Sequence, residues 1–154
     1  MASVNPIPDG YATITPYLRV RGGAAAIDFY KRAFGARELA RLSAKDPAKV
    51  LHAELMIGDS HLMLGDESVE MKCPSPLTLG GTGSGIHLYV QDADATYAKA
   101  IEAGATSVMP PQNMFWGDRY AKVTDPFGQE WSIASRVEEV PPAEIEARAA
   151  KLFP

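Results

Sequence analysis

The chain has 154 residues, and its second half repeats landmarks of its first half in nearly the same register. This internal repeat constrains the fold more than any other feature of the sequence. The recurring landmarks are a strand-like segment, a helix-ending glycine and a turn glycine, namely Tyr17–Val20 with His87–Val90, Gly35 with Gly104, and Gly58 with Gly128. Their offsets are 70, 69 and 70 residues. Because three landmarks share one register, the sequence predicts two copies of one structural unit.

In the first half, the residue pattern predicts a strand, a helix and three further strands. Partial alternation of apolar and polar residues marks Thr13–Val20 as a strand, with Pro16 at an edge or a bulge. Helical spacing of apolar residues predicts a helix over Ala24–Phe34, which Gly35 ends. The three further strands are predicted at Arg37–Leu42, Val50–Ile57 and Ser60–Leu64, the last two joined by a Gly58-Asp59 turn.

The second half follows the same order. A strand is predicted at Gly85–Val90, and Asp92 is a suitable N-cap for a helix over Ala93–Ala103. Three strands follow at Thr106–Met109, Arg119–Val123 and Glu130–Ala134, with a loop over Pro110–Gly117 between the first two of them. Finally, two prolines introduce a last helix over Ala143–Leu152.

Together these elements predict an α+β protein of two βαβββ modules. Modules of this kind cover one face of the sheet with a helix, so we expect the other faces to form a curved mixed sheet around a shared cavity. The predicted first module covers residues 12–66 and the second covers residues 84–137. A linker rich in proline and glycine, residues 67–83, is expected to be mobile, and residues 138–154 form a helical tail.

Composition excludes several classes of function. The 15 basic and 19 acidic residues give a net charge of -4 without a cluster of Lys or Arg, which argues against a nucleic-acid partner. The single cysteine, Cys73, excludes an internal disulfide and any CxxC motif, and we interpret it as an incidental loop thiol. The first residues lack the basic and apolar regions of a secretory signal, and no apolar run approaches roughly 18 residues. A cytoplasmic protein with no membrane partner is therefore expected.

Several longer motifs resemble one known superfamily. They are YLRVRG followed by AIDFYKRAFGA, then HLYVQDADATYAKAIEAGA, and finally DPFGQEWSI. These segments resemble the vicinal oxygen chelate superfamily of glyoxalases, bleomycin-resistance proteins, fosfomycin-resistance enzymes and extradiol dioxygenases, over roughly residues 12–137. WGDRY before DPFG and the LFP tail resemble a glyoxalase-like branch whose members mostly lack an assigned activity. The resemblance implies a homodimer, with the Ala143–Leu152 helix and the arm of residues 1–12 as candidates for contacts with the second chain.

The resemblance also implies where a metal would bind. Enzymes of this superfamily hold a divalent metal with four His, Gln or Glu side chains on the first and last strands of each module. The corresponding positions here lie near Thr15, Leu62, Gly85 and Ser132. None of these residues is a usual ligand of zinc, iron or nickel, so no metal cofactor is expected.

A displaced metal site is the alternative. His87 lies two residues after Gly85 and Glu130 lies two residues before Ser132, so the period of a strand keeps both on the face expected to line the cavity. With His52 they could hold a divalent metal that has an open coordination position. The other interpretation is that His87 and Glu130 are hydrogen-bonded polar groups of a cavity wall.

Aromatic residues indicate a small-molecule ligand. Tyr17 and Tyr89 are expected on related strands, and Phe115 and Trp116 on a loop, an arrangement typical of a pocket wall or of simple packing. Arg119 could form an ion pair with Asp118 or bind an anionic ligand. The candidate ligand-binding residues are Tyr17, His87, Tyr89, Trp116, Arg119, Glu130 and Ser132. Two functions are thus predicted: metal-independent binding of a small aromatic or antibiotic-like molecule, or a metal-dependent lyase, isomerase or dioxygenase with a displaced site.

Overall fold

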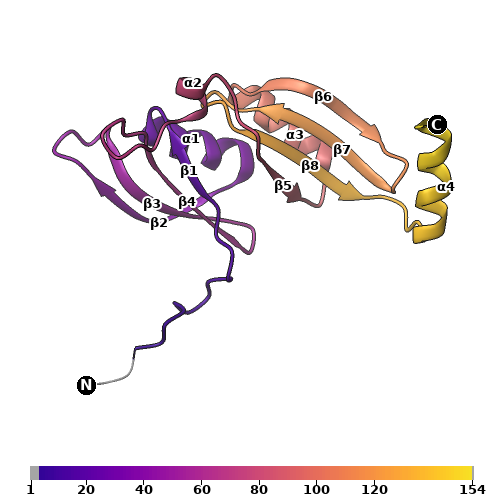
Figure 1. Ribbon diagram of the computed structural model, residues 1–154, viewed down its shortest axis with the longest axis horizontal. Coiled ribbons are helices and arrows are strands. Elements are labelled where there is room, and N and C mark those ends of the chain that lie inside the picture. Colours follow the sequence, from indigo (N-terminus) through magenta and orange to yellow (C-terminus); the bar gives the residue numbers. More distant parts are fainter. Residues whose placement is uncertain (1–3, 154) are drawn as a thin grey trace. The chain divides into compact units, whose positions relative to one another are not determined.

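The strands form two separate four-stranded mixed sheets, one in each half of the chain (Figure 1). A computed structural model describes residues 4–153, so residues 1–3 of the expected N-terminal arm lie outside the described residues. Two units are distinguished: unit 1 ends at Gly81 and unit 2 begins at Thr82. Each unit runs strand, helix and three strands before its remaining segment, so the prediction of an α+β protein with two βαβββ modules is confirmed.

Unit 1 is built on a sheet in the order β1-β4-β3-β2, in which only β1 and β4 are parallel. Its elements are β1 (Tyr17–Val20), α1 (Gly23–Phe34), β2 (Arg37–Ser43), β3 (Val50–Ile57), β4 (Ser60–Asp66) and the short α2 (Pro76–Leu79). Helix α1 packs against β3 and β4. The fully buried side chains of this core include Ile27, Phe29 and Tyr30 from the helix and Val50, Leu55 and Leu64 from the strands. As predicted, α1 ends at Gly35, which has a φ of 65°.

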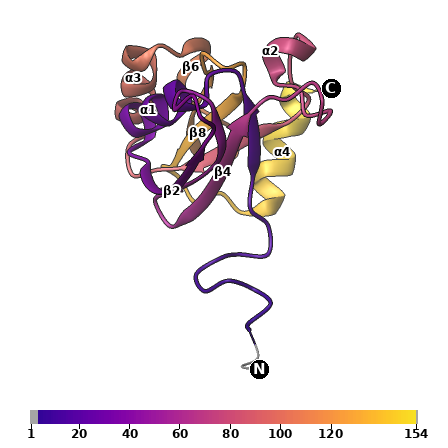
Figure 2. The ribbon, with the colours of Figure 1, turned by 90° about the vertical axis from the view of Figure 1, so that its left-hand side faces the viewer.

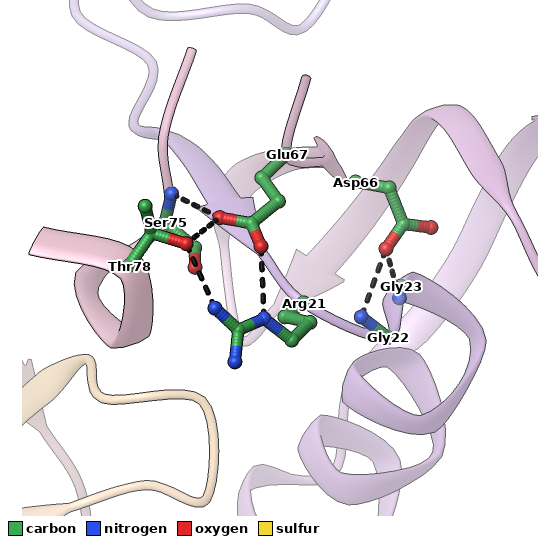
Figure 3. Close-up of polar contacts among 7 residues, drawn as sticks. All are labelled: Arg21, Gly22, Gly23, Asp66, Glu67, Ser75 and Thr78. Carbon is green, nitrogen blue, oxygen red and sulfur yellow. Dashed lines mark hydrogen bonds and ion pairs between the residues drawn. The ribbon is translucent and has the colours of Figure 1, made fainter. Parts of the chain in front are cut away.

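The carboxylate of Asp66 fixes the start of α1 to the sheet, as Figure 3 shows. One oxygen accepts hydrogen bonds from the amides of Gly22 and Gly23 at 2.8 and 3.0 Å. The other oxygen accepts from the amide of Val50 at 2.7 Å. A single side chain at the end of β4 therefore satisfies amides at the N-terminus of α1 and at the start of β3.

The segment after β4 was expected to be a mobile linker, but the structure gives it defined contacts (Figure 3). Its central group is the Glu67 carboxylate, which accepts hydrogen bonds from the Arg21 guanidinium, the Ser75 amide and the Thr78 hydroxyl at 2.6–2.8 Å. These hydrogen bonds, with that of Thr78 the strongest, hold the pKa of Glu67 below its usual value. Ser75 precedes α2, so Glu67 joins this short helix to the end of β1.

Unit 2 repeats the architecture with the order β5-β8-β7-β6, and only β5 and β8 are parallel. Its elements are β5 (Gly85–Tyr89), α3 (Ala93–Ala103), β6 (Thr106–Asn113), β7 (Asp118–Thr124), β8 (Glu130–Arg136) and α4 (Pro142–Leu152). Helix α3 covers one face by packing against β6, β7 and β8. The predicted N-cap is confirmed, because the Asp92 side chain accepts a hydrogen bond from the Ala95 amide at 2.9 Å.

The two largest differences between predicted and observed strand boundaries both involve proline. Strand β6 continues through Pro110 and Pro111 to Asn113, where a loop was predicted. Because β6 is an edge strand, a residue that cannot donate to a ladder is tolerated there, and the register shifts between Met109 and Gln112. Strand β1 begins at Tyr17 rather than Thr13, just after Pro16.

The turn between β7 and β8 is organised by a buried carboxylate. Asp125 is 4 % exposed, and one of its oxygens accepts hydrogen bonds from the amides of Phe127 and Gln129, both at 2.9 Å. The other oxygen accepts from the indole nitrogen of Trp131 at 2.9 Å. Trp131 is fully buried on the face that α3 covers, so this aspartate links the turn to the core of unit 2.

Helix α4 is attached to unit 2 through Arg148 at one end of the sheet (Figures 1 and 2). The Arg148 guanidinium pairs with Glu138 at 2.8 Å and Glu144 at 2.9 Å, and it donates to the Phe115 carbonyl at 3.2 Å. None of the residues of α4 is buried. Among residues 4–153, no helix combines the length and the apolar character that crossing a membrane would require.

Candidate functional site

The helix-free face of the unit 2 sheet carries most of the predicted ligand-binding residues. Side chains alternate along a strand, and Ala121, Val123, Trp131 and Ile133 are buried on the side of α3. The intervening residues of β7 and β8 therefore lie on the opposite face. In β5, His87 and Tyr89 are exposed, and the register places His87 beside Ser132 and Gly85 beside Glu130.

Four aromatic rings gather on this face. The ring centroids of His87 and Tyr89 lie 4.6 Å apart in an edge arrangement, and His87 lies 6.1 Å from Tyr120 with the rings nearly parallel. Trp116 meets Tyr120 at 5.7 Å, also edge to face. These distances are typical of favourable aromatic pairs. We call the set His87, Tyr89, Trp116, Tyr120 and Ser132 the aromatic face.

A buried carboxylate underlies the aromatic face. Asp118 is only 4 % exposed. One of its oxygens accepts a hydrogen bond from the indole nitrogen of Trp116 at 2.9 Å and another from the hydroxyl of Tyr89 at 3.3 Å. A buried acceptor with two aromatic donors fixes the orientation of both rings. Two rings of the aromatic face, Trp116 and Tyr89, are therefore oriented by the protein itself.

The polar groups of this face are paired among themselves. The Ser132 hydroxyl lies 2.7 Å from the Nδ1 atom of His87. Glu130 forms an ion pair with Lys122 at 2.9 Å, and this contact raises the pKa of the lysine. The Glu130 carboxylate is thus paired with Lys122, and the His87 ring is hydrogen-bonded to Ser132.

Arg119 lies on the other face of the sheet. Its side chain forms two hydrogen bonds of 2.8 Å to the carboxylate of Asp94, in the first turn of α3. This contact lowers the pKa of Asp94 and raises that of Arg119. Of the two interpretations of Arg119, the ion pair with Asp118 is therefore wrong, because adjacent residues of a strand point to opposite faces.

The remaining candidate, Tyr17, belongs to unit 1. Its hydroxyl lies 2.9 Å from the Nδ1 atom of His52, and the guanidinium of Arg19 lies 4.5 Å from the centre of its ring. The Nε2 atom of His52 in turn lies 3.2 Å from the carboxylate of Glu54. These residues form a hydrogen-bonded row on the helix-free face of unit 1.

Three of the four positions at which the superfamily resemblance places a metal ligand offer no suitable donor here. Gly85 has no side chain, and the hydroxyl of Ser132 is engaged with His87. Leu62 is 3 % exposed and packs in the core, because the pairing of Tyr17 with Met63 places Met63 rather than Leu62 on the helix-free face. The Met63 thioether is a soft ligand, unlike the His, Gln and Glu side chains that the resemblance implies for this site.

The alternative ligand set is divided between the units. His52 lies in unit 1, whereas His87 and Glu130 lie in unit 2. Within residues 4–153, no three His, Cys, Asp or Glu side chains lie together in a group that could hold a metal ion.

The sequence analysis did not identify Tyr120 and Lys122 of unit 2 or Tyr11 of unit 1 as site residues. Tyr120 follows Asp118 by two residues and Lys122 follows by two more, so the strand period could have placed them on one face. Asp118 was considered only as a partner of Arg119. Tyr11 had no such signal, since its contacts lie on strands more than 40 residues away in the sequence.

Comparisons with known proteins identify the family. The model of the Glyoxalase/Bleomycin resistance protein/Dioxygenase superfamily matches residues 10–133. The uncharacterized protein Rv0887c of Mycobacterium tuberculosis is 45 % identical over 137 residues, which cover 87 % of this chain and 80 % of that protein. The crystal structure of the At5g48480 gene product of Arabidopsis thaliana is 32 % identical with a TM-score of 0.63, covering 80 % of this chain and 98 % of its own. The crystal structure of protein PA1353 from Pseudomonas aeruginosa is 27 % identical with a TM-score of 0.65. The match covers 82 % of this chain and 99 % of that chain. The chain belongs to the Glyoxalase/Bleomycin resistance protein/Dioxygenase superfamily.

Proposed function

We propose that the protein binds a small aromatic molecule at the aromatic face of unit 2, without a metal. The observation that carries this proposal is the buried carboxylate of Asp118, which orients Trp116 and Tyr89 from beneath. Tyr89 is 68 % exposed although its hydroxyl is held by Asp118. Rings that are exposed and yet fixed in orientation lose little conformational entropy when a ligand stacks on them.

The same face offers polar recognition. The His87 and Ser132 pair can donate to or accept from a ligand, and the Lys122 and Glu130 pair places both charges beside it. A few placed polar groups among aromatic rings are typical of small-molecule sites. The absence of fitting donors at the superfamily's metal positions supports a binding protein over a metal-dependent lyase, isomerase or dioxygenase.

Trp116 provides the first test of this proposal. We would titrate the protein with indole-, naphthalene- and purine-based compounds and follow the binding by calorimetry. For a compound that binds, Trp116→Ala is expected to weaken affinity by about 30-fold or more, since a central aromatic anchor is lost. Trp116→Phe should cause a smaller loss, because it keeps a ring but not the donor to Asp118.

Tyr97→Ala is a matched control, because this aromatic residue lies on α3, which covers the other face of the sheet. It should leave the affinity unchanged. Equal affinities of Trp116→Ala and the original protein would show that the ligand binds elsewhere. Failure of every compound in the panel to bind would refute the proposal.

We also propose that two chains form a homodimer, as the superfamily resemblance implies. Helix α4 has no buried residue, and Leu152 and Phe153 at its end are 58 % and 73 % exposed. Light scattering should give twice the mass of one chain, and Leu152→Ser should shift the mass toward a single chain. A mass of one chain at all concentrations would contradict this expectation.

A further inference from the structure

The helix-free face of unit 1 is occupied by a side chain of the same protein. The ring of Tyr11 stacks on the ring of His61 with centroids 3.8 Å apart and an interplanar angle of 22°. The Tyr11 hydroxyl donates a hydrogen bond to the carboxylate of Glu54. His61 and Glu54 alternate with buried leucines along β4 and β3, so both lie on the face that α1 does not cover.

The groups around Tyr11 form a site for a phenol. His61 supplies a flat ring for stacking, and Glu54 supplies an acceptor for the hydroxyl. Glu54 is itself positioned by the Nε2 atom of His52, whose Nδ1 atom lies 2.9 Å from the hydroxyl of Tyr17. The hydrogen bond to Glu54 raises the pKa of Tyr11 to about 12, and the bonds from Tyr11 and His52 lower the pKa of Glu54. A neutral phenol facing an ionised carboxylate is thus the favoured state across neutral pH.

The segment that carries Tyr11 makes mostly local contacts. Residues 4–10 are exposed, and their hydrogen bonds join Asn5 to Asp9 and to Ile7, while the Tyr11 amide donates to the Pro8 carbonyl. On the other side of Tyr11, Ile14 is 84 % exposed. Figure 2 shows the N-terminal segment running away from the sheet. The side chain of Tyr11 therefore anchors an otherwise exposed segment, and such segments open at low cost.

We propose that this face of unit 1 is a binding site for phenols, and that Tyr11 is an internal occupant which a phenolic ligand displaces. The site goes beyond the function proposed for unit 2, because it consists of other residues in the other unit. Its chemistry requires both a ring for the His61 stack and a hydroxyl for Glu54. Because the occupant is tethered, a free phenol must compete with a high local concentration of Tyr11.

The experiment uses 4-methylphenol, which reproduces the tyrosine side chain. Calorimetric titration of the full chain should show that Tyr11→Ala binds this probe about tenfold more tightly than the original protein or better, since the competitor has been removed. The probe 4-methylanisole, whose oxygen cannot donate, should bind at least about tenfold more weakly to the same variant. Adding Glu54→Gln to Tyr11→Ala should also weaken binding of 4-methylphenol about tenfold. Glu70→Gln, at an exposed position of the same unit, should have no effect.

A second measurement does not depend on the alanine variant. In the original protein, carbon-13-labelled histidine should report a shift of the His61 ring signal when excess 4-methylphenol replaces Tyr11. Equal affinity of the original protein and Tyr11→Ala, or no effect of Glu54→Gln, would overturn the proposal and leave Tyr11 as a cover for a polar face. Loss of 4-methylphenol binding in Trp116→Phe would also overturn it, since binding would then belong to the aromatic face of unit 2.

Discussion

Replacing Asp125 with alanine is expected to lower the free energy of unfolding by about 3–4 kcal/mol, among the largest effects of any single substitution in this chain. The Asp125 side chain is 4 % exposed and accepts hydrogen bonds from the Phe127 and Gln129 amides and the Trp131 indole, all at 2.9 Å. Alanine would remove the acceptor of all three donors in a place with little access to water. The loss of three hydrogen bonds and the cost of leaving three buried donors without an acceptor would both lower the free energy of unfolding.

The chain provides a matched control for this substitution. Asp59 occupies the turn of the equivalent hairpin in unit 1, but it is exposed and its carboxylate accepts a hydrogen bond from the neighbouring Ser60 hydroxyl. Urea unfolding followed by circular dichroism should show that Asp59→Ala changes stability by no more than about 0.5 kcal/mol. Similar changes for Asp59→Ala and Asp125→Ala would contradict the structural role given to Asp125.

Gly117→Ala is expected to destabilise unit 2 by about 3 kcal/mol or more and to disturb the aromatic face. Gly117 has a φ of 104°, a conformation that other residues rarely adopt. A Cβ atom built there would lie 2.4 Å from the Glu138 carbonyl oxygen and 3.0 Å from a methyl group of Val140. Because Gly117 adjoins Trp116, relief of this overlap would move the indole away from Asp118.

Two readouts distinguish this effect from a general loss of stability. Unfolding by urea gives the change in free energy, and the NMR signal of the Trp116 indole N–H reports whether the indole still donates to Asp118. Gly83→Ala serves as the control, since no atom lies within 4 Å of a Cβ built at that position. If Gly117→Ala kept both the stability and the Trp116 signal, the close contact with Glu138 would be refuted.

The helix boundaries that depend on a single residue type were predicted correctly from the sequence. Asp92 caps α3 and Gly35 ends α1, as their residue types indicate. The repeat predicted the order of the elements because both halves keep it. The contacts of the connection after β4 were not predicted, because they join Glu67 to Ser75 and Thr78 and to Arg21, a pairing that composition does not reveal.

For the candidate site, too, local patterns were predictable from the sequence and contacts between distant residues were not. Strand periodicity placed His87, Glu130 and Ser132 on one side of the sheet, and the structure brings them to the helix-free face. The predicted metal position at Leu62 was one residue away from the helix-free face. Leu62 lies in the core, and its neighbour Met63 lies on that face. The contact of Tyr11 with Glu54 could not be predicted, since the two residues lie 43 positions apart and meet only in the tertiary structure.

We propose that the aromatic face binds its ligand without a metal. The most direct measurement is calorimetric titration of the protein with the aromatic panel twice, once after treatment with a chelator and once after addition of zinc, nickel, manganese or ferrous iron. We predict that a compound binds with the same affinity in both states and that no metal is retained in a one-to-one ratio. Binding that appears only with a metal, and that is lost in His87→Ala together with one tightly bound metal ion per chain, would contradict the account.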